Sequence, residues 1–501
     1  MKKKPKLLGI AASLRNARWG AGNADLINAL KNIKKEEDLL TYLAQESELH
    51  LENFLNAGRK DQKSFLEIYS NLKKNKGDKG LSNSEVALAS ALWAALFYEV
   101  DIDHISLGEY FLASGSIRNE LELKNKLIEA DGLLISGPVY FGDRGSLVQA
   151  LINLIKSDKH LKEKLTNKIY AGITVGAKRN GGQETTLIYQ MFDFINLGYW
   201  AVGNDSDTTA QYGGTCVAGD VGTMHKDVYG LKTSMGTGRR IASVIREVFY
   251  ERPLKGPVKV LFLILQDKNF FVKNQLEKMI GHLDKESCIT SIIDVSNKSI
   301  MPCIACDICP THIDIDSVYR CIINSKNDDL AGLHAQLLNY DAVCPVLYSP
   351  CDSENVKSNY QAFIERTRYL RRGDYVFNNQ LVAPVIFEEV GANENYALRA
   401  ITSMIRHHTV ISKPITAFLH NDILLNGDKV KLQFNDLINS VRKMASARIG
   451  EIFQEKNHQY NPVGYLLSAN KDLEDNQLNL RKTMINSRID FLTKEAKNRL
   501  G

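Results

Sequence analysis

The stretch KLLGIAASLRNARWGAGN, residues 6–23, follows the basic start MKKKP and has two opposite interpretations. A basic segment before an apolar one is typical of a secretory signal. However, the apolar run ends at Leu14, and two arginines follow where small neutral residues are expected before a cleavage site. The alternative is a buried first strand, Lys6–Ala11, then a polar loop and a helix from Ala24. We therefore predict a strand–loop–helix unit in a cytoplasmic protein.

A loop of this kind between a strand and a helix is a candidate anion site. It contains Ser13, Arg15 and Asn23 together with small residues. Unpaired backbone N–H groups converge at a helix start, and the helix dipole favours negative charge there.

The composition excludes several classes of partner. The 501 residues include 63 basic and 58 acidic side chains, for a net charge of +5, which gives no reason to expect nucleic acid or an anionic membrane as partner. The most apolar long segment, Val86–Tyr98, is shorter than the roughly 20 residues that span a bilayer, and predicts a buried helix. Four of the eight cysteines fall in one short stretch, which in a cytoplasmic chain indicates metal or redox chemistry.

Apolar, β-branched runs alternate with helical periodicity through the first half of the chain. This alternation is typical of a parallel sheet with helices on both faces, so we predict the doubly wound α/β class. The predicted strands are Lys6–Ala11, Val100–Leu107, Gly132–Ser136, Lys168–Val175 and Tyr199–Val202. The predicted helices are Ala24–Lys35, Leu121–Ala130, Leu147–Lys156 and Glu184–Leu197. Residues 36–98 break this rhythm and predict a helical insertion.

The pattern stops at Glu251–Pro257 and begins again with the apolar run Val258–Leu265. In addition, LIEADGLLISGPVYFGDRG and VGAKRNGGQETT of the first half parallel LLNYDAVCPVLYSPCDSEN and VGANENYALRA of the second, in the same order. Two matched segments at an offset of about 210 residues indicate a tandem duplication. We predict a first domain at 1–252, a second at 257–449 and a helical tail at 450–501.

Two further loops of the first half follow predicted strands. Gly137–Gly142 is a stiff turn with aromatic side chains, and Gly176–Thr185 carries glycines before a helix. Because the carboxyl ends of parallel strands meet at one edge of the sheet, these loops and the opening loop predict a cofactor crevice.

Residues 5–250, apart from the insertion, resemble the NAD(P)H-dependent FMN reductases of the flavodoxin-like group, especially the iron–sulfur flavoproteins. The resemblance rests on a G-x-x-x-S-x-R loop with a small polar residue at the next helix start (Gly9, Ser13, Arg15, Asn23), on SGPVYFG at Ser136–Gly142, and on GGQETT at Gly181–Thr186. The closing stretch, with an Asp-x-x-Gly before a final helix, is also similar. The resemblance implies FMN as cofactor and NAD(P)H as co-substrate.

By the same resemblance, Ser13, Arg15 and Asn23 would hold the FMN phosphate. The isoalloxazine ring would be lined by Pro138, Val139, Tyr140, Phe141 and Gly142, with Gly181, Gly182, Gln183 and Glu184 near its pyrimidine edge. GTGRR at Gly236–Arg240 lacks the dinucleotide G-x-G-x-x-G pattern, but in this family the nicotinamide stacks directly on the flavin.

The second half differs at the corresponding loops. After its first strand comes QDKNFF, residues 266–271, with no Ser-x-Arg and no glycine, so bulky side chains would keep a phosphate from the backbone. We expect this half to bind flavin weakly or not at all.

The second half instead carries MPCIACDICPTHIDIDSVYRC, residues 301–321. The spacing Cys303-x2-Cys306-x2-Cys309 is typical of a loop around an iron–sulfur cluster, with Cys321 as fourth ligand and Cys344 or Cys351 as substitutes. A related motif occupies the same place in iron–sulfur flavoproteins. Thiolates also suit zinc, so a [4Fe–4S] cluster, a zinc ion and no metal all remain open.

These features predict an oxidoreductase that passes electrons from NAD(P)H through FMN to a quinone-like or protein acceptor, with or without an iron–sulfur cluster. The alternatives are an electron-transfer or redox-sensing protein without turnover, and a maturation factor for another redox protein. Relatives assemble as oligomers, so a homodimer, or a pseudo-dimer within one chain, is expected.

Overall fold

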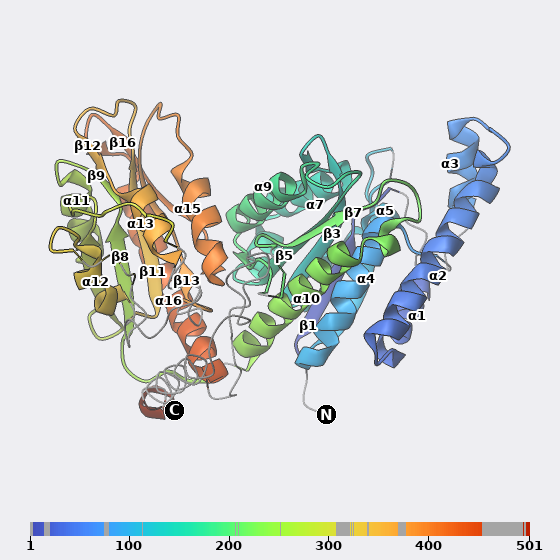
Figure 1. Cartoon of the computed structure of the whole chain (residues 1–501), viewed down its shortest axis with the longest axis horizontal. Coiled ribbons are helices and arrows are strands. Elements are labelled where there is room, and N and C mark those ends of the chain that lie inside the picture. The colour runs from blue at the N-terminus through green and yellow to red at the C-terminus, as the bar shows by residue number, and fades with distance from the viewer. Residues whose placement is uncertain are drawn as a thin grey trace. The chain divides into compact units, whose positions relative to one another are not determined.

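The chain folds into two compact units, Met1–Phe249 and Tyr250–Gly501. The computed structural model describes residues 4–14, 21–74, 80–112, 114–205, 207–208, 210–250, 252–306, 321, 323, 325–337, 340–368, 377–452, 494 and 497–500. Of the helices within these ranges, none is long and apolar enough to cross a bilayer. Figure 1 shows a sheet flanked by helices in each unit.

The first unit is built on a parallel sheet in the order β2-β1-β3-β5-β7. The strands are β1 (Lys6–Ala11), β2 (Asp101–Ser106), β3 (Gly132–Tyr140), β5 (Ile169–Gly176) and β7 (Gly214–Val217), and the short β6 (Trp200–Ala201) pairs with the start of β5. The predicted bounds of β1 are confirmed. The sequence interpretation missed β7, because its four residues sit among glycines and polar residues.

Helices cover both faces of this sheet. The core helices are α4 (Asn83–Ala95), α6 (Glu120–Glu129), α7 (Ser146–Ser157), α8 (Lys159–Leu165), α9 (Gln183–Asn196) and α10 (Val228–Phe249). A Cβ on Gly132 of β3 would meet Ile245 of α10, and Gly132 pairs with Ile169 of β5. A Cβ on Gly172, three residues after Ile169 along β5, would meet Leu187 of α9. Consecutive strand residues point to opposite faces, so α9 and α10 lie on opposite sides of the sheet. This confirms the doubly wound α/β class.

The range predicted as a helical insertion includes a core helix. It contains α2 (Glu36–Phe54), the π-helical turn Leu55–Arg59, α3 (Phe65–Lys74), α4 and the 3-10 turn Leu96–Tyr98, and is preceded by α1 (Ala21–Asn32). All residues of α4 except Asn83 are buried, and α4 packs against α10 and the sheet (Figure 1). The contact is close because Gly238 faces α4: a Cβ there would lie 2.0 Å from the carbonyl oxygen of Ala91. Thus Gly238 of GTGRR serves helix packing, whereas Gly236 faces the side chains of Asn204 and Asp205.

The second unit has the same strand order, β10-β8-β11-β14-β16. Its strands are β8 (Val258–Ile264), β10 (Cys288–Asp294), β11 (Ala342–Ser349), β13 (Leu381–Val382), β14 (Val385–Glu389), β15 (Val410–Ile411), β16 (Ile415–His420) and β17 (Ile423–Leu424). Its helices are α11 (Phe271–Ile280), α12 (Leu330–Leu337), α13 (Tyr360–Arg366), α15 (Tyr396–Met404) and α16 (Gly427–Ile452). In both units the fifth strand is split in two, as β6 and β7 or β15 and β16. The tandem duplication itself stays a prediction.

Most of the predicted tail, residues 450–501, lies outside the described residues. The described end of the chain returns to the start of the second unit, where Leu500 pairs with Leu254. Arg499 binds both carboxylate oxygens of Asp341 at 2.8 Å.

Candidate functional site

Three loops of the first unit follow adjacent strands, β1, β3 and β5, at their carboxyl ends. Half-buried Ser13 lies in the first loop, two residues after β1, whereas Arg15 lies outside the described residues. The amide N–H of Ala12 donates to the Ser136 carbonyl at 2.8 Å, so the first loop leaves the sheet directly beside β3. In a sheet of strand order 2-1-3-4-5, the chain leaves the neighbouring first and third strands toward opposite faces. Ligands bind outside the carboxyl ends of these two strands.

The second loop is a tight hairpin. Val139 and Tyr140 pair antiparallel with Asp143 and Arg144 of β4. The two turn residues, Phe141 and Gly142, have φ of 52° and 78°, as a type I′ turn requires. Tyr140 is 48% exposed and Phe141 107% exposed, so this hairpin presents aromatic surface to solvent. A bulky residue with positive φ is uncommon, and this points to a role outside folding.

One arginine holds the hairpin in place. Arg144 donates to the Gln149 side chain of α7 at 3.1 and 2.8 Å and pairs with Asp193 of α9 at 2.6 Å. Burial raises the pKa of Asp193 more than Arg144 lowers it. The second loop is therefore bound to helices on either side of it.

The third loop, residues 177–182, touches the hairpin turn. Gly182 has a φ of +99°, and a Cβ on it would lie 2.8 Å from the Cα of Gly142. Gln183 is buried, and its side chain accepts from the Gly181 amide at 2.8 Å and donates to the carbonyls of Lys178 and Cys216. Gln183 thus shapes the loop, while Gly181 and Glu184 are exposed. The structure brings the second and third predicted loops together.

Asn23 has other partners than the predicted anion. Its side-chain oxygen lies 2.8 Å from His104 Nδ1, and its amide donates to Glu109 at 3.4 Å. His104 is fully buried, 3.9 Å from Glu85. The side chain of Asn23 is therefore already engaged by His104 and Glu109.

The sequence interpretation missed the N-terminus of α4. Ser82 and Glu85 form a capping box there, and Ser136, in the middle of β3, donates from its hydroxyl to the Ser84 carbonyl at 2.8 Å. Asn83 donates to the Asp220 carbonyl and accepts from the Met224 amide. The helix start next to β1 and β3 is therefore that of α4. The motif Ser82-x-x-Glu85 before an apolar run could have revealed it.

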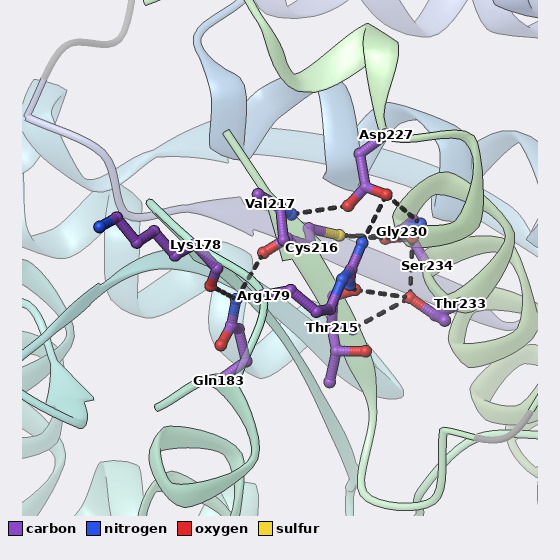
Figure 2. Close-up of polar contacts among 10 residues, drawn as sticks. All are labelled: Lys178, Arg179, Gln183, Thr215, Cys216, Val217, Asp227, Gly230, Thr233 and Ser234. Carbon is purple, nitrogen blue, oxygen red and sulfur yellow. Dashed lines mark hydrogen bonds and ion pairs between the residues drawn. The ribbon is translucent and has the colours of Figure 1, made fainter. Parts of the chain in front are cut away.

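A polar cluster joins the third loop to β7 and α10 (Figure 2). Asp227 accepts from the amides of Val217 at 2.7 Å and Gly230 at 3.0 Å, and pairs with Arg179 at 2.6 Å. Cys216 is fully buried beside the Ser234 hydroxyl, and burial raises its pKa to about 12, so its thiol stays protonated.

The second unit fills the corresponding strand ends with its own side chains. The buried carboxylate of Asp267 accepts from the amides of Val272 and Lys273 and so caps α11. The short strands β9 (Gln266–Lys268) and β12 (Val356–Ser358) pair antiparallel beyond the end of β8. The Tyr348 hydroxyl donates to Glu389. The helix start that would face a phosphate already holds a carboxylate.

The cysteine segment is described in part, with Cys309 outside the described residues. The amide of Ala305 donates to the Cys303 sulfur at 3.4 Å, and Cys306 and Cys321 are half-buried. The buried pair Arg366–Asp328 binds both ends of the segment, because Arg366 donates to the carbonyls of Met301 and Ile323. Among the described residues, no three His, Cys, Asp or Glu side chains could together hold a metal ion.

Comparison with known proteins gives one family and three relatives. Residues 79–206 match the family model of the NADPH-dependent FMN reductases. The matched segment begins just before α4. The relatives are three iron–sulfur flavoproteins. That of Methanocaldococcus jannaschii is 38% identical over 125 residues, which are 25% of this chain and 64% of that protein. Those of Methanosarcina thermophila and Archaeoglobus fulgidus are 30% and 28% identical over 25% and 24% of this chain, and the match covers 61% of each of these proteins. The chain thus spans less than two thirds of each relative.

Among solved structures, a WrbA-like flavodoxin protein of Agrobacterium tumefaciens aligns with 48% of this chain and 98% of its own, at 14% identity and a TM-score of 0.26. A likeness this low has no bearing on function.

Proposed function

We propose that this chain is an NADPH-dependent FMN reductase, the family whose model matches residues 79–206, and that its first unit binds FMN and oxidises NAD(P)H. Electrons would pass to a quinone-like small molecule or a redox protein. The observation that carries the proposal is the contact between the second and third loops at Gly142 and Gly182. This contact lies at the edge of the sheet where β1 and β3 end. Flavodoxin, which has this strand order, binds FMN at that position.

The residues at the carboxyl ends of β1 and β3 suit the phosphate and the ring of FMN. Ser13 and the backbone amides of Asn83 and Ser84, at the start of α4, would hold the phosphate, in place of Asn23. Helix N-termini suit phosphates because their N–H groups and dipole favour negative charge.

The exposed rings of Tyr140 and Phe141, with Pro138 and Val139 behind them, would border the flat ring. Gly181 and Gly182 would offer backbone groups to its edge, with Gln183 holding their loop. Bound FMN accepts a hydride from a nicotinamide, and the protein supplies position and electrostatics.

Two fixed loops give this unit a preorganised site. Arg144 holds the hairpin to α7 and α9, and Gln183 holds the third loop to β7. Because both loops are bound before any ligand arrives, little conformational entropy is lost on binding. The exposed aromatic hairpin would exclude water from one side of the reacting rings.

The second unit is proposed to have a different role. Asp267 already occupies the amides of Val272 and Lys273 at the start of α11, so we propose that this unit does not bind FMN. Its segment with Cys303, Cys306, Cys309 and Cys321 would hold an iron–sulfur cluster that relays electrons. Iron and zinc determined on protein purified without oxygen test this: about four irons per chain support the cluster, and zinc or no metal refutes it.

The experiment for the first unit compares FMN with riboflavin, which lacks the phosphate. Wild-type protein should bind FMN more tightly and, once loaded, should oxidise NAD(P)H when a quinone is added. Ser13→Ala should reduce the preference for FMN over riboflavin, whereas Asn23→Ala should keep it. If wild-type protein binds neither flavin, the proposal fails. A bound flavin that NAD(P)H does not reduce would indicate an electron carrier.

A further inference from the structure

Arg179 connects the middle of the third loop to two other elements. One guanidinium nitrogen donates to the Thr215 carbonyl of β7 at 3.0 Å, and the other lies 2.6 Å from Asp227. The guanidinium also lies over the ring of Tyr229, 5.3 Å from its centre. An arginine presents several donors in a fixed plane, so these contacts define one orientation of the loop.

Asp227 is the fixed end of this link. Its side chain is 12% exposed, against 41% for Arg179. Its two oxygens accept from the amide of Val217, at the end of β7, and from the amide of Gly230, in the first turn of α10. The carboxylate therefore joins β7, α10 and the third loop in one place (Figure 2).

Two side chains thus hold the third loop from different positions. Gln183 binds the start of the loop at the Lys178 carbonyl and also binds the Cys216 carbonyl of β7. Arg179 binds the middle of the loop to β7 at the Thr215 carbonyl. The far end of the same loop contacts the aromatic hairpin through Gly182 and Gly142. A displacement of Arg179 would therefore move the loop proposed to border the flavin.

We propose that Arg179 and Asp227 are positioning residues that hold the third loop for FMN and balance the charge at that edge of the flavin. This inference rests on the proposed function. Reduction adds negative charge to a flavin, so nearby charges of opposite sign change its midpoint potential in opposite directions.

The test uses Arg179→Met and Asp227→Asn, with FMN affinity measured by fluorescence and the midpoint potential of the bound flavin by spectroelectrochemistry. Each variant should weaken FMN binding about tenfold, as expected for a lost charge-assisted contact. Arg179→Met should make the potential more negative, and Asp227→Asn should make it more positive. Arg179→Lys, which keeps the charge, should retain a potential close to that of the wild type.

The matched control is Arg239→Met, because Arg239 forms a similar 2.7 Å ion pair with Asp205 within the first unit. This variant should leave both readouts unchanged. If the wild type binds FMN but the Arg179 and Asp227 variants bind it equally well, the positioning role is refuted. If both potentials shift in the same direction, the electrostatic role is refuted. If the wild type binds no FMN, the proposed function itself fails.

Discussion

Gly182→Ala is the substitution that most directly tests the contact between the second and third loops. Gly182 has a φ of +99°, and a Cβ on it would lie 2.8 Å from the Cα of Gly142. The atom it meets is backbone of a hairpin that Arg144 holds, so it cannot turn aside as a flexible side chain would. Relief requires the two loops to separate.

The magnitude follows from three terms. The left-handed conformation costs an alanine about 1–2 kcal/mol. Forcing a methyl group against fixed atoms costs about 1–3 kcal/mol. The reduced entropy of the unfolded chain returns about 0.4–1 kcal/mol. We expect Gly182→Ala to lower the free energy of unfolding of the first unit by about 2–4 kcal/mol.

The assay is urea unfolding followed by tryptophan fluorescence, because all three tryptophans belong to the first unit. The control is Gly115→Ala, which has a similar φ of +83° but no atom within 4 Å of the added Cβ. It should lose about 1 kcal/mol or less. Equal losses for the two variants would refute the loop contact. FMN affinity should fall for Gly182→Ala alone.

Three further predictions concern other features of the two units. Burial raises the pKa of Cys216 to about 12, whereas the thiol of an unfolded chain ionises near 8.5. The contribution of this thiol to the free energy of unfolding is therefore complete below about pH 8.5 and falls by about 1.4 kcal/mol per pH unit up to about pH 12. Urea titrations across this range should show a shallower fall in the free energy of unfolding for Cys216→Ala. Arg366→Met should destabilise the second unit by about 3–5 kcal/mol, because it leaves Asp328 buried and uncompensated; hydrogen exchange should report this, and adding Asp328→Leu should restore much of the stability. Phe141→Ala removes a fully exposed ring, so stability should change by less than about 0.5 kcal/mol, while FMN affinity should fall; unchanged affinity would contradict its role at the flavin.

The local pattern of the sequence was sufficient for the fold class and for the first strand. Apolar runs that alternate with helical periodicity predict a parallel α/β sheet, and β1 begins and ends where the sequence indicates. The turn at 141–142 and the loop at 177–182 could also be located, within the longer loops predicted at 137–142 and 176–185, because glycines and aromatic residues follow apolar strands. These features depend on neighbouring residues, so the sequence alone contains them.

The tertiary structure decided which helix faces the site and which loops touch. Residues 14–82 separate Ser13 from the start of α4, and no local pattern shows that α4, buried on almost every side, returns to the end of β1. The contact of Gly142 with Gly182 and the pairing of Arg179 with Asp227 likewise join residues far apart in the chain. Such contacts exist only after the apolar faces of distant helices have packed on one sheet, because burial of apolar surface, rather than local backbone preference, places these elements.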